Sequence, residues 1–219
     1  MRRFIGMAAI VGMAAVTAAC AANGADAGDQ TMGQRSFAAS GFDKIDSAGS
    51  QRVVVTVGGA ASVRAEGPQA ALDRLEIGVE DGSLHIGNRS GSWTSGSRQP
   101  VTIHVTVPAL AGASVGGSGM ISVNRVEGPR FAGTVGGSGT LLIEQLRVAE
   151  AEFSVGGSGS INASGAVQRL DANLGGSGGL DFGGLEARLA NLRSRAPATS
   201  PPGPARPRTS ASPDPVTSP

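Results

Sequence analysis

Apolar residues alternate with small and polar ones along the second half of the chain, around four copies of one short sequence. Each copy follows an apolar residue, and further apolar positions mostly lie two and four residues beyond it. Such alternation is typical of β-strands, and a constant period of about 20 residues indicates stacked structural repeats. The repeated residues are Gly116, Gly117, Ser118, Gly119, Gly136, Gly137, Ser138, Gly139, Gly156, Gly157, Ser158, Gly159, Gly175, Gly176, Ser177 and Gly178.

The positions around these copies predict an all-β solenoid in which two or three short strands make one coil. We expect Val135 and Val155 to stack in one inward column. Ile121, Leu141, Ile161 and Leu180 should form a second, and Val126, Leu146 and Leu185 supply a third apolar point. A helix is disfavoured because each glycine costs about 1 kcal/mol relative to alanine. We expect the glycines to supply positive φ at sharp corners, and like residues of successive coils to lie about 4.8 Å apart.

The first half of the chain predicts further short strands. They cover residues 53–57, 62–65, 75–79, 84–86 and 101–107, with Asp81 and Gly82 in a hairpin turn and one or two helical turns over 69–75. Residues 88–100 form a polar loop that carries Trp93, the one tryptophan. We interpret Trp93 as a lid over one end of the solenoid, with a ligand contact as the alternative.

Several of these stretches together resemble the head GIN domain family of auto-transporter adhesins. They are residues 41–45 (Gly-Phe-Asp-Lys-Ile), 75–86, 101–108 and the repeated Gly-Ser-Gly. The resemblance covers residues 40–193. It implies a right-handed, single-stranded, pectin-lyase-like parallel β-helix in a bacterial envelope protein, and it brings no catalytic residue with it.

The N-terminus has the pattern of an export signal. Two arginines precede an apolar run over residues 4–19, which is too short for a typical membrane span. Residues 16–20 resemble a bacterial lipobox ending at Cys20, although Thr17 stands where leucine is preferred. The sequence thus predicts a lipid anchor on Cys20 and an outer-membrane or periplasmic location in a Gram-negative bacterium. Ordinary cleavage around Ala19 and Ala21 is the alternative, and residues 21–39 read as a flexible tether.

The composition changes after Arg193, and residues 194–219 contain eight prolines. Proline cannot donate to a strand ladder, so we expect a disordered tail. A single-base shift of reading frame permits Gly-Ser-Gly again at positions 196 and 214, which continues the period. We therefore interpret the tail as a frameshifted remnant of further coils; a genuine proline-rich tail is the alternative.

The net charge and the motifs argue against nucleic-acid binding, hydrolase activity and metal binding. The net charge of +1 offers no case for nucleic-acid binding. Gly175 to Gly179 match the hydrolase elbow Gly-x-Ser-x-Gly but belong to a structural repeat, and both histidines lie far upstream. The period differs from that of calcium-binding β-helices. His85 and His104 have the pattern of outward or hydrogen-bonded structural residues, so we expect no cofactor or metal.

Two function classes remain. The favoured one is a non-catalytic adhesin or surface binding module, with a surface glycan or envelope protein as partner, and with self-association through an open end of the helix. The alternative is a carbohydrate-active β-helix enzyme, which requires clustered acids. The acids of the coils are scattered, and Glu150 and Glu152 are the closest pair.

Overall fold

The computed structural model describes residues 32–89 and 101–195, and this part of the chain is almost entirely β-structure. It contains thirteen strands and one short helix. In chain order they are β1 (Met32–Phe37), β2 (Lys44–Ser47), β3 (Arg52–Val57), β4 (Ser62–Pro68), α1 (Gln69–Leu72), β5 (Leu75–Glu80), β6 (Ser83–Asn88), β7 (Thr102–Val107), β8 (Gly112–Val115), β9 (Met120–Val123), β10 (Val126–Val135), β11 (Thr140–Val155), β12 (Ser160–Leu174) and β13 (Gly179–Ser194).

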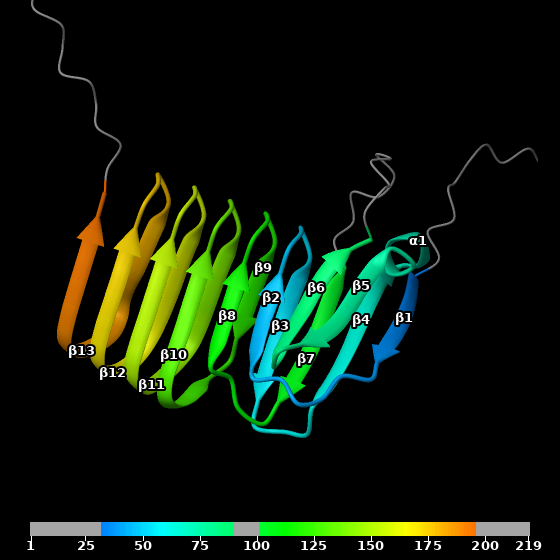
Figure 1. Ribbon diagram of the computed structural model, residues 1–219, viewed down its shortest axis with the longest axis horizontal. Helices are drawn as coiled ribbons and strands as arrows, with labels where there is room; N and C mark the ends of the chain where they lie inside the picture. The colour runs from blue at the N-terminus through cyan, green and yellow to red at the C-terminus, as the bar shows by residue number, and fades with distance from the viewer. Residues whose placement is uncertain (1–31, 90–100, 196–219) are drawn as a thin grey trace, which may run out of the picture. The chain divides into compact units, whose positions relative to one another are not determined.

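The strands form a β-solenoid with two broad sheet faces (Figure 1). Face A consists of β5, β6, β2, β8 and β10, followed by the C-terminal parts of β11, β12 and β13. Face B consists of β1, β4, β7, β3 and β9, followed by the N-terminal parts of β11, β12 and β13. A Gly-Gly-Ser-Gly turn joins the faces on one side, and a short third side joins them on the other. Successive coils pair in parallel, which confirms the stacked solenoid.

The core is a set of inward columns in the predicted register. Val135 lies opposite Val155 in the β10–β11 ladder, and both are buried. Leu141 pairs with Ile121 on one side and Ile161 on the other, and Ile161 pairs with Leu180. Aromatic rings also contact one another in the interior of the solenoid. The ring centres of Phe131 and Phe153 lie 6.1 Å apart, and those of Phe153 and Phe182 lie 5.3 Å apart.

The reason for the turn glycines differs from the expected one. None of them has a positive φ; in the coils that conformation occurs at Gly128 and Gly165 instead. The second and fourth glycines of each turn are required because the turns stack closely. A Cβ at Gly137 or Gly157 would collide with a carbonyl oxygen of the preceding turn. Backbone bonds such as Ser158 N–H to Gly137 O, 3.1 Å, join the turns into the expected ladder.

A fifth turn, which the repeat pattern in the sequence does not reveal, belongs to the same ladder. Residues 48–51 (Ala-Gly-Ser-Gln) keep only the second glycine and the serine of the pattern. They link β2 to β3, and Gly119 N–H donates to Gly49 O at 2.8 Å. Gln51 takes the place of the fourth glycine and is buried, with its Nε2 3.1 Å from Asn88 Oδ1. The repeat is invisible in sequence because residues 58–111 separate this coil from the next.

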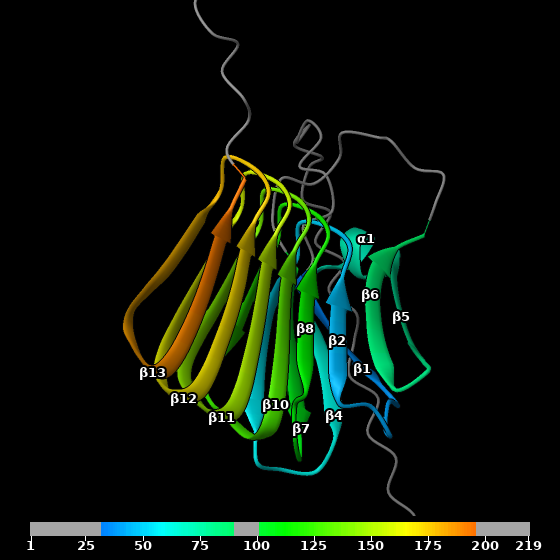
Figure 2. The ribbon, with the colours of Figure 1, turned by 60° about the vertical axis from the view of Figure 1, so that its left-hand side comes forward.

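Those intervening residues close the N-terminal end of the solenoid. The β2–β3 coil lies between β6 and β7 on one side and β8 and β9 on the other (Figure 2). Beyond β6 and β7 the sheets continue with antiparallel strands: β5 pairs with β6, and β4 with β7. The β5–β6 hairpin turns at Asp81 and Gly82, as predicted. Helix α1 buries Leu72 at this end.

The domain boundaries differ in detail from the expected ones. The expected tether over residues 21–39 is wrong for its last part, because Met32–Phe37 is a strand paired antiparallel with β4. Alternation is weak in β1, so pairing with β4 determines its conformation. The last strand extends to Ser194, and Arg195 N–H still donates to Leu174 O at 2.9 Å. The leader with Cys20, Trp93 and residues 196–219 lie outside the described residues.

Candidate binding groove

A groove lies on face B near the closed end of the solenoid. It has a volume of about 820 Å³. Outward residues of β4, β7 and β3 line it together with the segment that leaves β1. The lining residues are Ser36, Phe37, Ala38, Ala39, Ser40, Thr56, Ala61, Ser62, Val63, Arg64, Glu66, His104 and Thr106.

Strand alternation explains why polar side chains line this groove. Ile103 and Val105 of β7 point into the core, so His104 and Thr106 point outward. Arg64 of β4 lies directly opposite His104 in the antiparallel ladder, and Ser62 lies opposite Thr106. Thr56 is opposite Thr106 on the other side, in β3. Hydroxyl groups, an imidazole and a guanidinium therefore converge on one patch.

The charged groups of the groove differ in their partners. Glu66 accepts a 2.6 Å hydrogen bond from the side-chain amide of Gln34 in the neighbouring strand β1. Arg64 is exposed, and no carboxylate among the described residues forms an ion pair with it. Its guanidinium therefore keeps its donors available for a ligand.

The apolar part of the groove is contributed by the end of β1, the segment after it, and the start of β4. Phe37 is half-buried and packs against the core, with the Arg35 guanidinium 5.3 Å from the centre of its ring. Ala39, Ala61 and Val63 lie beside it in the lining. A groove with an aromatic side chain and several polar groups is suited to a ligand with both apolar and hydroxylated faces.

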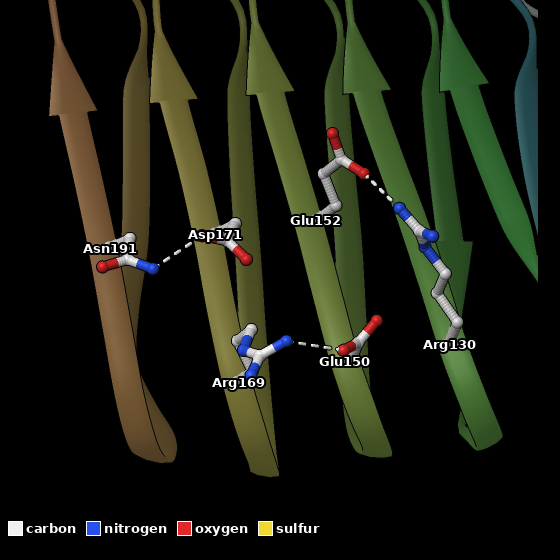
Figure 3. Close-up of polar contacts among 6 residues, drawn as sticks. All are labelled: Arg130, Glu150, Glu152, Arg169, Asp171 and Asn191. Atoms are coloured by element: carbon white, nitrogen blue, oxygen red, sulfur yellow. Dashed lines mark hydrogen bonds and ion pairs between the residues drawn. The ribbon is translucent and has the colours of Figure 1, made fainter.

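The acid pair singled out in the coils has a different environment. On the outer surface of face A, Glu150 Oε1 is 2.8 Å from Arg169 Nη1, and Glu152 Oε2 is 2.8 Å from Arg130 Nη2 (Figure 3). Beside them Asn191 donates a 2.9 Å hydrogen bond to Asp171. Each glutamate thus has an arginine partner on a neighbouring coil. The ladder of ion pairs accounts for these acids as contacts between successive coils.

The two histidines point outward from their strands, as expected. His85 Nδ1 lies 3.6 Å from Asp46 Oδ2 on face A, and His104 lies in the groove on face B. Among residues 32–89 and 101–195, no three histidine, cysteine, aspartate or glutamate side chains gather closely enough to hold a metal ion.

Comparison with protein families decides the relationship of this chain. Residues 41–200 match the model described as "Putative auto-transporter adhesin, head GIN domain". The chain belongs to the head GIN domain family. No curated protein matches the sequence significantly. Strands β2 to β13 lie within the matched residues, whereas residues 36–40 of the groove lining precede them. In the described part of the chain, no helix has the length and apolar character needed to cross a membrane.

Solved structures show the same fold. A protein from Parabacteroides distasonis, titled "Putative lipid binding protein", has a TM-score of 0.57 at 20% identity and covers 74% of this chain and 78% of its own. A "putative adhesin" from Parabacteroides merdae has a TM-score of 0.56 at 15% identity, covering 74% and 77%. At these identities the comparison establishes the shared solenoid and nothing about ligands.

Sequence reasoning identified none of the groove as a site. It singled out His104 only as a structural residue, and it gave no role to Arg64 or Phe37. The sequence contains only a weak signal for a binding role of Arg64. This residue occupies an outward position of a short strand, where a solvent-exposed arginine is also common. Only the pairing of β4 between β1 and β7 brings these residues together.

Proposed function

We propose that this head GIN domain is a non-catalytic binding module of the bacterial cell envelope, an adhesin whose groove on face B takes a saccharide. Membership of an adhesin family supports the surface role. The observation that carries the ligand class is the convergence of Arg64, His104 and Thr106 beside Phe37. Saccharides present hydroxyl groups to polar side chains and a C–H face to an aromatic ring.

The unpaired arginine gives the ligand a further property. Arg64 is the one arginine or lysine in the groove lining, and Glu66 already accepts a hydrogen bond from Gln34. A carboxylate or sulfate on the saccharide would form a charge-assisted hydrogen bond with the guanidinium. We therefore assign the groove to an acidic surface glycan. An envelope protein presenting an acidic side chain is the competing partner.

Attachment to the membrane completes the proposal. Cys20 follows the lipobox-like residues 16–19, and the first described strand begins at Met32. Lipidation of Cys20 would leave about a dozen residues between the anchor and the first strand. The domain would then be held close to the outer membrane or within the periplasm, which is consistent with the surface role of the family.

A glycan array tests the ligand class. The full chain should bind acidic saccharides in preference to neutral ones. Arg64→Ala should weaken that binding about tenfold or more, because hydrogen bonds to charged groups contribute about 1.5–3 kcal/mol. Arg52→Ala is the matched control, since Arg52 is also exposed on face B but does not line the groove.

The outcomes separate the candidates. Equal loss with both variants, or no binding to any saccharide, would contradict the glycan proposal. Binding to envelope extracts that survives glycosidase but not protease treatment would identify a protein partner. Turnover of a bound saccharide would favour the alternative, a carbohydrate-active β-helix enzyme.

A further inference from the structure

The two ends of the solenoid are built differently. At the N-terminal end, β1, β4, β5 and α1 cover the coils (Figure 1). At the other end β13 is a 16-residue strand that, among the described residues, pairs with β12 alone. One side of its backbone therefore has unpaired N–H and C=O groups along its length. A long open edge of this kind is a template for pairing with another strand.

The side chains of this end are also incompletely covered. Leu192 is 66% exposed, although its position in the ladder points inward and it pairs with the buried Ala172. Phe182 and Leu185 are only partly buried. In earlier coils the equivalent inward positions are fully buried, as at Phe153 and Leu146. The end thus lacks one further layer.

We propose that a second copy of this chain supplies that layer, through a two-fold, end-to-end dimer in which β13 pairs antiparallel with β13 of the partner. Among the described residues β1 and β5 are also sheet edges, but each has six residues, so β13 offers the longest open edge. Association of like ends through β13 closes the assembly at two copies. An interface of this type must be self-complementary. The residues of β13 meet that condition.

The shape of the coil limits the register of such a pair. Gly179 directly follows the last turn, and Ser194 pairs with Leu174, which precedes it. A two-fold rotation that exchanges the two faces therefore places Gly179 beside Ser194 of the partner, to within one residue. Side chains that point into the solenoid must also lie opposite inward side chains of the partner strand. A one-residue slip would place them opposite outward side chains. Two registers remain, centred on Glu186 or on Ala187. The first keeps inward residues opposite inward ones along the strand, and the second does so over most of the strand but places the inward Leu185 opposite the outward Leu189.

Charge distinguishes the two registers. Centring on Glu186 places two identical carboxylates against each other. Centring on Ala187 pairs Asp181 with Arg193, Glu186 with Arg188, and Phe182 with Leu192, since the members of each pair are equally distant from Ala187. All four charged residues are exposed and form no ion pair among the described residues. The register centred on Ala187 therefore pairs opposite charges and brings Phe182 against Leu192, and we assign the dimer to it despite the mismatch of Leu185 and Leu189.

The rest of this chain is a poorer occupant of the edge. After Arg195 the chain has 24 residues, eight of them proline. Proline has no N–H to donate, and no stretch of the tail longer than five residues is free of it. The sequence of the tail therefore contains no proline-free segment as long as the 16 residues of β13.

Sedimentation of the purified full chain tests the dimer. The wild type should sediment as a dimer, and Arg193→Asp should raise the dimer dissociation constant about tenfold, because like charges then meet at two symmetric contacts. Adding Asp181→Arg to that variant should restore the dimer. Arg52→Asp, the same change on a distant part of face B, should leave the dimer intact. A monomeric wild type, open-ended filaments, or a double variant as weak as the single one would overturn the proposal.

A cross-link gives an independent measurement that does not alter charge. Residue 187 lies on the proposed axis and faces its own copy, where antiparallel Cα atoms lie about 4.5–5.5 Å apart, within disulfide range. Ala187→Cys should therefore form a disulfide-linked dimer on oxidation. Ala132→Cys, exposed on β10, should give only the background of the parent chain, whose single cysteine is Cys20. Equal cross-linking of both variants would contradict the register.

Discussion

At the scale of single residues, the repeated turn contains glycines of two kinds. The second and fourth glycines are needed because the next turn lies directly against them. The first glycine has a different environment: a Cβ at Gly136 or Gly156 would have no atom within 4 Å. The same residue type in adjacent positions thus has different causes, which the repeat pattern by itself does not reveal.

A pair of substitutions should distinguish the two kinds. Gly157→Ala forces a methyl group against Gly137 O, and we expect a loss of about 1–3 kcal/mol in the free energy of unfolding. Gly156→Ala should be neutral or raise it by about 0.4–1 kcal/mol, because it restricts the unfolded chain. Urea titration followed by circular dichroism measures both. Equal destabilisation by the two changes would show that close stacking of the turns is not the reason for the glycines.

Much of the residue-scale pattern was nevertheless accessible from sequence. The inward columns through Val135 and Leu141 follow from alternation and period alone. The reason for the glycines was wrong, since positive φ falls at Gly128 and Gly165 instead. The alternation of apolar and polar residues predicts which way a side chain points. It does not predict how closely two turns stack, because that distance depends on residues about 20 positions away in the sequence. The role of Arg64 was missed for the same reason.

At the scale of elements, each coil is stabilised by the coils on either side. Phe153 of β11 is fully buried and contacts Phe131 of the preceding coil, whereas Phe182 belongs to the last coil and is partly exposed. In repeat architectures stability is close to a sum of such nearest-neighbour contacts. Interior coils should therefore contribute more to the free energy of unfolding than the terminal coil does.

The phenylalanines allow this difference to be measured. Phe153→Ala should lower the free energy of unfolding by about 3–5 kcal/mol, as expected for a fully buried ring. Phe182→Ala should cost less when measured below the dimer dissociation constant. Thermal unfolding of the two variants at matched concentration provides the comparison. If Phe182→Ala proved the more damaging change in the monomer, the last coil would contribute more to stability than its exposure indicates.

The elements at the closed end were only partly predictable. The β5–β6 hairpin and the helical turn have local signals in Asp81-Gly82 and in residues 69–72. Strand β1 has no local sequence signal, and its pairing with β4 is long-range. The position of the β2–β3 coil also depends on long-range pairing, with β6 and β7 on one side and β8 and β9 on the other. Because the groove lies where β1, β4 and β7 meet, its position could not be predicted from local patterns.

At the scale of the whole molecule, export of the protein and its lipid anchoring at Cys20 are predictions from the N-terminal sequence. Cys20→Ser should abolish labelling with palmitate and release the chain from the membrane fraction, because a hydroxyl cannot form the thioether on which lipidation depends. Metabolic labelling followed by fractionation of the cells measures both. A variant that still carries palmitate would contradict the lipobox interpretation and favour ordinary cleavage near Ala19.

The gene tests the interpretation of the tail. A single-base shift near codon 193 should open a frame that encodes two further Gly-Ser-Gly coils. These coils would cover β13 within the same chain, so the restored protein should melt at a higher temperature and remain monomeric. A gene without such a frame would establish the proline-rich tail as genuine and leave β13 available for the dimer.

The central claim is that face B binds an acidic saccharide at the closed end of the solenoid, and a crystal structure with a saccharide selected on the array tests it most directly. The account predicts the sugar beside Phe37, with its acidic group within about 3.2 Å of the Arg64 guanidinium. It also predicts polar contacts from His104 and Thr106. A sugar bound instead over the ion pairs of Glu150 and Glu152 on face A would contradict the account.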